Sequence, residues 1–492
     1  MPIDTPEWVR DAVFYEIFPD RFARSARMTP IGQYEAWDAP PTVHGIKGGD
    51  LYGIVDRLPE LADLGINALY LTPVFSSASN HRYHAYDYLT VDPVLGGDAA
   101  LRELLDRAHE RGMRVILDGV FNHCGRGFWP FHHILELGAN SPYRDWFHLD
   151  QAVLDGGLEL NAYPERGGMS GRDPLGYRAW WGLPALPKFN TDNPATREYL
   201  LGVGEHWLRF GIDGWRLDVP AEIDDRSFWA EFRRRCRAVD PDAYLVGEIW
   251  DEAPEWLEGD RFDALMNYPL GTAILGFVGA DHLDVAVIYR HDSYRRMIHP
   301  LDGPGFARRL EALMTAYDPA VVAVQLNLIG SHDTPRALTV LGADRAALGL
   351  ATVLQATLPG APCIYYGDEI AMPGDHDPDN RRAYPVDPAA GDQSMRALVR
   401  AVMTARHEHV ALRRGSLVVL SAAGGALAYL REAEGRRAIV AINPGSAAAS
   451  LAVPRGDQRS YRQLELPGLA SGSLAKGTIE LPPKSALVLV EA

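Results

Sequence analysis

The chain has little cysteine and no long apolar run. Its 492 residues include three cysteines, Cys124, Cys236 and Cys363, whose spacing fits neither a disulfide framework nor a zinc motif. We therefore expect free thiols and a reducing compartment. Because no stretch of 18 apolar residues occurs, no membrane-spanning helix is expected. The first residues also lack the basic and apolar segments of a signal peptide, so the cytoplasm is the expected location.

Basic residues are too few to suggest a polyanionic partner. The 48 Lys and Arg residues face 65 Asp and Glu residues, a net charge of -17. Nucleic acids and anionic membranes require a basic surface, so neither is an expected partner. Aromatic residues, by contrast, are plentiful, with 11 Trp and 21 Tyr. Most should pack in a core, but flat aromatic faces also stack on sugar rings.

Eight continuous apolar runs recur along most of the chain. Such runs are typical of parallel strands that are buried on both faces. Amphipathic segments at 99–111, 196–210 and 225–239 lie between them and predict helices. Eight strand–helix units predict an α/β fold, a (β/α)8 TIM barrel with its site at the carboxyl ends of the strands. The predicted strands are 12–18, 68–75, 114–121, 214–219, 244–250, 264–270, 324–331 and 363–368.

The spacing of these runs predicts three domains. The barrel, domain A, would comprise 1–123 and 191–413. The long connection at 124–190, rich in Gly, Pro and aromatic residues, exceeds an ordinary loop and predicts an inserted domain B on one wall of the cleft. Residues 414–492 predict a C-terminal antiparallel β-sandwich, domain C. Its expected strands are 416–420, 426–430, 437–442, 447–453 and 485–490.

Three acidic residues follow apolar runs and predict a reaction class. Asp218, Glu248 and Asp333 each end a predicted strand with a polar neighbour. A lone carboxylate at such a place is as often a helix cap or a turn residue. Three at successive strand ends favour retaining glycoside hydrolysis, which uses a nucleophile and an acid about 5–5.5 Å apart.

The neighbours of these acids suggest a role for each. Asp218 is the predicted nucleophile, because Arg216 lies on the same face of the strand and should lower the carboxylate pKa. Glu248 is the predicted general acid, since its apolar neighbours should raise its pKa. Asp333 would hydrogen-bond sugar hydroxyls and favour a distorted ring. Asp118 is expected to be a structural carboxylate that pairs with Arg216 or orients the site.

Histidine and aromatic residues beside these acids predict sugar contacts. A single histidine is usually a packed structural residue, but His123 and His332 both adjoin a strand-end acid, which favours donors to sugar hydroxyls. Neither has a second histidine at i+4, so no zinc motif is present. Tyr83 and Trp250 are candidate platforms for a sugar ring. For Phe128, Trp129, Trp180 and Trp181 the same role is open, with core packing as the alternative.

At these residues the chain resembles the α-amylase superfamily, glycoside hydrolase family 13. Its four signature regions are similar to 118–123, 214–222, 247–250 and 327–333. The resemblance implies the catalytic roles given above. It also implies a domain B after the third strand and a C-terminal β domain.

A closer resemblance is to the neopullulanase, cyclomaltodextrinase and maltogenic amylase subfamily. It rests on 6–22, 186–190 and 377–382. The last stretch is similar to the segment that holds the sugar at the non-reducing side of the cut. The implied substrate-binding residues are Tyr83, His84, His123, Arg216, Trp250, His332, Asp377 and Arg381.

Two departures from that subfamily affect the expected specificity. The barrel starts within the first dozen residues, so we expect the subfamily's extra N-terminal β domain to be absent, which leaves a homodimer and a cyclodextrin preference open. The relatives tend to show Val-Ala-Asn-Glu after the nucleophile, whereas this chain has Val-Pro-Ala-Glu at 219–222. We therefore expect the acceptor side of the site to differ.

The calcium loop that the resemblance implies is altered. After the first strand, 21–27 is basic where the subfamily supplies several Asn and Asp, and only Gly49-Asp50 persists. Calcium takes six to eight oxygen ligands. We therefore predict no cofactor and no calcium in this loop, while a calcium site elsewhere stays open.

These observations predict an enzyme that acts on an oligosaccharide. The leading hypothesis is a retaining hydrolase of α-1,4 bonds, with some α-1,6 cleavage, in short linear or cyclic maltodextrins that include cyclic maltosyl-maltose. A transglycosylase or isomerase with the same three carboxylates is the alternative, because water and a sugar hydroxyl compete for one intermediate. A non-enzymatic barrel is the third interpretation, but it does not explain why all three carboxylates are present.

Overall fold

The computed structural model describes residues 3–164, 174–453 and 459–492. Eight parallel strands form one sheet in the order β8-β7-β6-β5-β2-β1-β10-β9. A bridge between Met266, next to β8, and Leu326 in β9 joins the two ends of this sheet. The predicted TIM barrel is confirmed. Its strands are β1 (Phe14–Ile17), β2 (Ala68–Leu71), β5 (Arg114–Gly119), β6 (Gly214–Leu217), β7 (Tyr244–Gly247), β8 (Ala264–Leu265), β9 (Leu326–Asn327) and β10 (Ala361–Tyr365).

Every barrel strand is shorter than the apolar run that predicted it. The largest difference is at 264–270, where β8 ends at Leu265 and helix α9 (Tyr268–Gly279) begins. The Asn267 side chain caps this helix by accepting a hydrogen bond from the Leu270 N–H, and Pro269 lies in its first turn. Proline is tolerated there because its missing N–H would have no helical partner. The prediction of a strand to 270 is wrong because a fully buried helix is as apolar as a buried strand.

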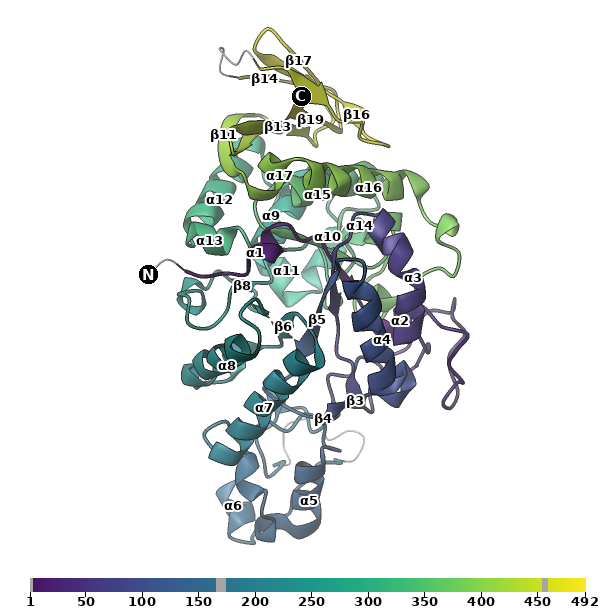
Figure 1. Cartoon of the computed structure of the whole chain (residues 1–492), viewed down its shortest axis with the longest axis vertical. Coiled ribbons are helices and arrows are strands. Elements are labelled where there is room, and N and C mark those ends of the chain that lie inside the picture. Colours follow the sequence, from purple (N-terminus) through teal and green to yellow (C-terminus); the bar gives the residue numbers. More distant parts are fainter. Residues whose placement is uncertain (1–2, 165–173, 454–458) are drawn as a thin grey trace.

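Helices pack around the barrel (Figure 1). The predicted helices at 99–111, 196–210 and 225–239 correspond to α4, α7 and α8. Asp50, Asn193 and Asp225 cap α3, α7 and α8 by accepting hydrogen bonds from first-turn N–H groups. The long helices are α3 (Leu51–Asp63), α4 (Gly97–His109), α7 (Pro194–Phe210), α8 (Arg226–Val239), α9, α12 (Gly303–Thr315), α15 (Arg345–Thr357) and α16 (Gln393–Glu408). The shorter ones are α1 (Glu7–Arg10), α2 (Pro19–Phe22), α5 (Trp129–Leu137), α6 (Gln151–Leu154), α10 (Val285–Tyr289), α11 (Asp292–Met297), α13 (Pro319–Val322), α14 (Ala337–Val340) and α17 (Val410–Arg414).

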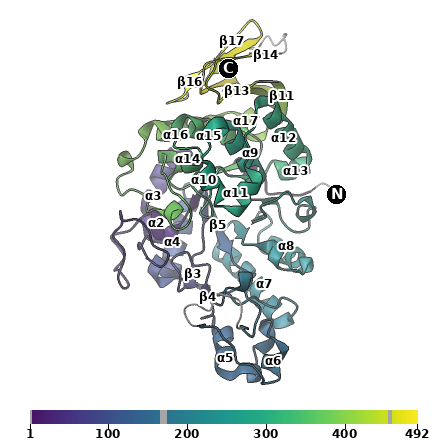
Figure 2. The same ribbon diagram turned by 180° about the vertical axis from the view of Figure 1, so that it is seen from behind.

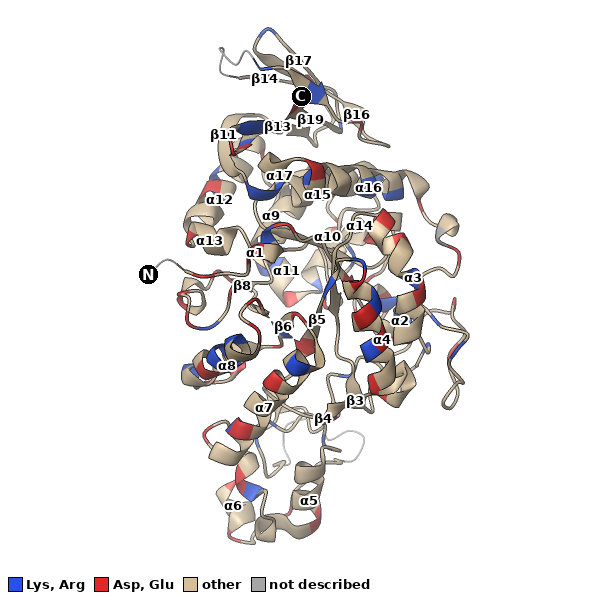
Figure 3. Cartoon of the chain, viewed as in Figure 1, with Lys and Arg blue, Asp and Glu red and all other residues tan. Residues whose placement is uncertain are grey.

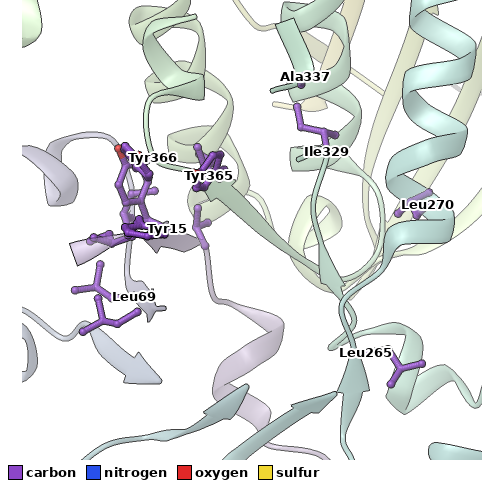
Figure 4. Close-up of a cluster of buried hydrophobic side chains, with 14 of the residues drawn as sticks. Tyr15, Leu69, Leu265, Leu270, Ile329, Ala337, Tyr365 and Tyr366 are labelled. Carbon is purple, nitrogen blue, oxygen red and sulfur yellow. The ribbon is translucent and has the colours of Figure 1, made fainter. Parts of the chain in front are cut away.

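Two apolar layers hold the barrel together. One face of each strand contributes residues such as Phe14, Ile116 and Val246 to a cluster between the strands. The opposite face contributes residues such as Tyr15 and Leu69 to a larger cluster that includes helix residues (Figure 4). Because successive side chains point to opposite faces, both layers together produce the continuous apolar runs of the sequence.

The chain leaves the barrel between β5 and α7. This segment contains α5 and α6, which lie at the end of the molecule opposite the C-terminal strands (Figures 1 and 2). An isolated β-bridge joins Lys188 of this segment to His123, and another joins Phe147 to Phe189 within the segment. It also meets the hairpin of β3 (Phe75–Ser77) and β4 (Ala85–Val91), where the Gly125 N–H donates to the Ala85 carbonyl. Residues 165–173, within the predicted domain B, lie outside the described residues.

The C-terminal part forms a mainly antiparallel sheet and a small second sheet. The larger sheet has the order β11-β12-β13-β19-β15, with β16 pairing parallel to β19, and the smaller one has the order β14-β18-β17. The predicted strands correspond to five of these, while β15 to β18 are too short and polar to stand out in the sequence. Residues 454–458 lie outside the described residues. The strands are β11 (Ser416–Ala423), β12 (Ala426–Ala433), β13 (Arg436–Asn443), β14 (Ala449–Ala452), β15 (Tyr461–Gln463), β16 (Ala470–Ser471), β17 (Ser473–Ala475), β18 (Thr478–Leu481) and β19 (Ser485–Glu491).

Charged residues of both signs are interspersed along the outer helices, as α4, α7 and α8 show (Figure 3). In the part of the chain that the structure describes, no helix is both long enough and apolar enough to cross a membrane.

Candidate active site

The barrel strands carry their polar residues on the face that fills the barrel interior. Phe14, Ile116 and Val246 belong to the inner apolar cluster, and residues two positions further along a strand share its face. The inner face therefore changes from apolar to polar towards the carboxyl ends of the strands. The polar residues that this alternation brings to one end of the barrel are Glu16, Tyr70, Asp118, Arg216, Asp218 and Glu248.

Arg216 joins the predicted catalytic carboxylates. Its side chain is fully buried, and its Nη1 lies 2.8 Å from Asp118 Oδ1 and 2.9 Å from Asp218 Oδ1. Its Nη2 lies 2.9 Å from Glu248 Oε2 and 3.9 Å from Asp333 Oδ2. One guanidinium thus contacts carboxylates from β5, β6 and β7 and from the segment after β9. The predicted pairing of Asp118 with Arg216 is confirmed.

Glu248 is held by donors to both of its oxygens. The Val219 N–H donates to Oε2 (3.0 Å) and Trp250 Nε1 donates to Oε1 (3.2 Å). Val219 has φ +35°, a conformation that is strained for a β-branched residue and that directs its N–H at the carboxylate. Burial raises the Glu248 pKa, Arg216 opposes this, and Asp333 adds to it. The predicted upward shift is confirmed.

The pKa of Asp218 departs from the prediction. Burial is the largest effect and raises the Asp218 pKa. Arg216 lowers this pKa, but the charges of Glu248 and Asp118 raise it further, so it lies well above the usual value. The expectation of a lowered pKa is wrong, because one guanidinium is shared among several buried carboxylates. Groups so close titrate together.

Asp333 and His332 face the same cluster. His332 Nε2 lies 3.1 Å from Asp333 Oδ2 and 2.5 Å from the Tyr83 hydroxyl, which donates to Asp118 Oδ2 (2.8 Å). Burial favours the neutral form of Asp333, but His332 and then arginine neighbours outweigh it and lower its pKa. The Tyr83 ring stacks on His332 at 5.5 Å and 11°. The structure therefore brings Tyr83, His332 and Asp333 together.

His123 and His84 lie beside this cluster in different surroundings. His123 is buried, its ring stacks on Trp180 at 5.0 Å and 16°, and burial lowers its pKa to about 3. Its Nε2 has no hydrogen-bond partner within the described residues. His84 packs edge-on against His81 at 4.9 Å, and burial lowers its pKa to about 4. Both imidazoles are therefore neutral near pH 7.

The Trp250 ring is already in contact with other rings, unlike a platform that is open to a sugar. Its indole stacks on Tyr268 with ring centroids 3.8 Å apart and planes 6° apart, and His291 lies 5.4 Å from it. One face is therefore covered, while its Nε1 holds Glu248. Stacking of a sugar on Trp250 stays a prediction.

Arg381 connects the segment at 377–382 to the carboxylates. Its Nε donates to the His332 carbonyl (2.8 Å), its Nη2 lies 3.3 Å from Asp333 Oδ1, and its Nη1 lies 3.0 Å from Asp377 Oδ2. Asp377 keeps about half of its side chain exposed. The two residues that the family resemblance added are thus adjacent to the site.

Three buried residues of the site were not predicted. Glu16 Oε1 lies 2.6 Å from His332 Nδ1. The Tyr70 hydroxyl donates to Asp118 Oδ2 (2.7 Å), and Asn380 Nδ2 donates to the carbonyls of His332 and Thr334. For two of them the signal was present in the strand alternation, since Glu16 and Tyr70 lie on the inner face of β1 and β2 and are paired with each other. Asn380 lies in the 377–382 segment, outside the barrel strands, and has no such signal.

Comparison with known proteins places this geometry in a family. Residues 16–409 match the model of the α-amylase catalytic domain. A cyclomaltodextrinase from Geobacillus thermopakistaniensis is 41% identical over 453 residues, which cover 91% of this chain and 71% of that protein. The crystal structure of a debranching enzyme from Nostoc punctiforme has a TM-score of 0.88 and 42% identity, with full coverage of both chains. A cyclic α-maltosyl-(1→6)-maltose hydrolase from Arthrobacter globiformis has a TM-score of 0.85 and 34% identity over 99% of this chain and all of the other.

The strand-end carboxylates around Arg216 and these similarities lead to one assignment. The chain belongs to the α-amylase family and is a glycoside hydrolase.

Proposed function

We propose that this enzyme is a retaining α-glucoside hydrolase that cleaves α-1,4 bonds, and some α-1,6 bonds, of short linear or cyclic maltodextrins. The observation that carries the proposal is the contact of one buried arginine, Arg216, with both Asp218 and Glu248 at 2.9 Å. Two carboxylates held by one guanidinium are neighbours, which supports the pair of carboxylates that a retaining mechanism uses.

In the first step, the Asp218 carboxylate attacks the anomeric carbon. The bond to the glycosidic oxygen breaks, and Glu248 gives its proton to that oxygen, which leaves with the departing sugar. The product is a covalent glycosyl ester on Asp218. Burial raises the pKa of both Asp218 and Glu248, so the assignment of acid and nucleophile rests on the similarity of their segments to the family's signature regions.

In the second step, water attacks the same anomeric carbon. The Glu248 carboxylate takes a proton from this water, the ester bond breaks and Asp218 is released as a carboxylate. Asp333, with His332 and Arg381 around it, would accept hydrogen bonds from the hydroxyls of the reacting sugar. The net reaction consumes one water for each bond cleaved.

The substrate class rests on the relatives. The Geobacillus relative bears the name cyclomaltodextrinase, and two similar solved structures bear the names debranching enzyme and cyclic α-maltosyl-(1→6)-maltose hydrolase. We extend this class to the present chain. The three cysteines are free and buried, which suits the proposed cytoplasmic location.

Product analysis on a substrate panel tests the proposal. The panel contains linear maltooligosaccharides, β-cyclodextrin, pullulan, cyclic maltosyl-maltose and sucrose. We expect glucose or maltose from the linear or cyclic dextrins, released first as the α-anomer because the configuration is retained. Asp218→Asn should abolish this release, whereas Asp145→Asn, at an exposed aspartate between β5 and α7, should not.

The panel also separates the alternatives. Longer or rearranged products with little new reducing sugar would replace the hydrolase by a transglycosylase or isomerase. A first product with the β-configuration would refute the retaining mechanism. No turnover of any α-glucan would refute the substrate class.

A further inference from the structure

Asp50 is the acidic residue of the family's calcium loop that this chain retains, and its carboxylate already accepts hydrogen bonds from the backbone. Asp50 Oδ2 accepts the Ser25 N–H (2.8 Å), and Asp50 Oδ1 accepts the Gly53 N–H (2.8 Å) at the start of α3. Asp20, which is fully buried nearby, accepts the N–H groups of Lys47 and Gly48, both at 2.9 Å. Both carboxylates therefore already have backbone donors. The residues present do not fit a calcium ion, which needs six to eight oxygen ligands.

A lysine ammonium lies inside this loop instead. Lys47 is fully buried, and its Nζ donates to the carbonyls of Ala36 (2.6 Å) and Ala39 (2.7 Å). The third neighbour is Glu35 Oε2 at 3.3 Å. Of the three N–H donors of the ammonium, two therefore have carbonyl acceptors, and a carboxylate oxygen lies at ion-pair distance. Burial opposes the ionisation of Glu35, but hydrogen bonds from Thr42 and Lys47 outweigh it and lower the Glu35 pKa.

The guanidinium of Arg24, from the segment 21–27, contacts the residues around Lys47. Arg24 Nε donates to the Lys47 carbonyl (2.7 Å), and its Nη2 donates to the Glu35 carbonyl (3.1 Å). The guanidinium also stacks over the Trp37 ring, 4.9 Å from the ring centroid. Two side-chain cations thus engage carbonyl and carboxylate oxygens, the ligand types that calcium prefers.

The loop of residues 34–47, which contains Lys47, contacts two segments beside the active site. The carbonyls of Val43 and Gly45 both accept hydrogen bonds from Asn80 Nδ2, at 3.0 and 2.8 Å. Asn80 is buried and lies three residues before Tyr83. On the other side of the loop, Trp37 Nε1 donates to the Tyr384 carbonyl (2.7 Å), three residues after Arg381. The shape of the loop is therefore coupled to two segments that carry predicted substrate binders.

We propose that the charged side chains of Arg24 and Lys47 bind the carbonyl oxygens of the 34–47 loop and take the place of calcium there. The Lys47 ammonium fixes the carbonyls of residues 36 and 39, and the Arg24 guanidinium fixes those of residues 35 and 47. The loop then keeps its shape, and with it the wall near Tyr83, without a divalent ion. This inference is independent of which α-glucan the enzyme cleaves.

The first experiment compares the purified enzyme with and without a chelator. After dialysis against EDTA, we expect the melting temperature and the activity to be unchanged, and added Ca²⁺ to raise neither. Metal analysis should find less than 0.1 calcium per chain at this point. A melting temperature that falls with EDTA and returns with Ca²⁺ would overturn the proposal. The melting readout does not depend on the proposed substrate.

The second experiment removes the cation. Lys47→Met should lower the melting temperature by about 5 °C or more, because the Glu35 carboxylate and two carbonyls lose their donor. Arg27→Met is the control, since Arg27 lies in the neighbouring segment 21–27 with Arg24 but forms an exposed pair with Glu103; it should shift the melting temperature little. Equal shifts for the two variants would contradict the proposal.

A chemical rescue separates the charge from the packing of the lysine stem. In Lys47→Ala, ethylammonium chloride should recover part of the lost melting temperature, and sodium chloride at the same ionic strength should not. Equal effects of the two salts would reduce Lys47 to a packing residue. If neither Lys47 variant folds, the chelator experiment on the unaltered enzyme still decides whether the loop depends on calcium.

Discussion

His332 Nδ1 lies 2.6 Å from Glu16 Oε1, and these two fully buried residues are separated by 316 positions in the chain. The Tyr83 hydroxyl donates its single proton to Asp118, so His332 Nε2 must be the donor in its 2.5 Å contact with Tyr83. Because Glu16 Oε1 faces Nδ1 as well, both ring nitrogens have acceptors, an arrangement that favours the imidazolium form of His332. Burial opposes this state, but Asp333 and Glu16 raise the His332 pKa above its usual value.

Replacing Glu16 by Gln should shift the pH dependence of the enzyme. Without the carboxylate, the His332 pKa falls, so the alkaline limb of kcat/KM moves to lower pH. The stabilisation from a raised histidine pKa is complete below the usual value of 6.5 and is lost as the pH rises through the raised pKa. The melting temperature of Glu16→Gln should therefore lie furthest below that of the unaltered enzyme at acidic pH. Thermal melts and rate profiles at pH 5–9 measure both effects.

Glu369→Gln is the control for this prediction. Glu369 is equally buried and accepts a hydrogen bond from Tyr15, the neighbour of Glu16. Its replacement should cost stability without moving the alkaline limb. An unshifted limb in Glu16→Gln would show that Glu16 acts on folding alone.

Azide should distinguish the roles of Asp218 and Glu248. With α-maltosyl fluoride as substrate, Asp218→Ala leaves space for azide at the nucleophile's position, and the product should be the β-maltosyl azide. In Glu248→Ala the covalent intermediate still forms, so azide should give the α-maltosyl azide. We expect each variant alone to have lost about 10⁴-fold or more in kcat on maltodextrins. NMR of the azide products makes the assignment, and the opposite pattern would reverse the two roles.

Trp250→Phe should change the acid Glu248 through one hydrogen bond. The stack on Tyr268 is kept, but the Nε1 donor to Glu248 Oε1 is lost. A donor favours the ionised carboxylate, so its loss raises the Glu248 pKa and moves the limb assigned to Glu248 to higher pH. The expected decrease in kcat is about 3- to 10-fold, for a hydrogen bond worth about 0.5–1.5 kcal/mol. Trp129→Phe, at an exposed tryptophan, is the control, and a matching profile in both variants would refute the assignment.

Arg431 should stabilise the contact between the C-terminal sheet and the barrel. This buried residue of β12 donates to the carbonyls of Gly415 and Ser416 and to that of Thr357 at the end of α15. Arg431→Met leaves these acceptors without their donor, at about 1–3 kcal/mol for each. We expect a clear fall in melting temperature by calorimetry, whereas Arg436→Met, on the exposed start of β13, should change it little. An equal effect of both replacements would exclude this role.

The fold could be read from the sequence where burial and periodicity agree. Parallel strands buried on both faces leave apolar runs such as 114–121, and amphipathic helices such as α7 leave a spacing of three and four residues. The sequence could not separate β8 from α9 at 264–270, because both are fully buried there. The short strands β15 to β17 were missed because they are largely exposed, and β18 because it has only four residues. These strands are held by pairing with other strands of their sheets.

For the site, the sequence alone determined which residue types end the barrel strands. Asp118, Arg216 and Glu248 stand out because a polar residue within or directly after a buried apolar strand has a local signal. The tertiary structure alone decided that Arg216 is shared by several carboxylates, which reversed the expected pKa of Asp218. It also decided the contact of Glu16 with His332, and the place of Lys47 inside a loop of carbonyl oxygens. These relationships depend on distances between residues far apart in the chain, and burial makes their electrostatic effects large.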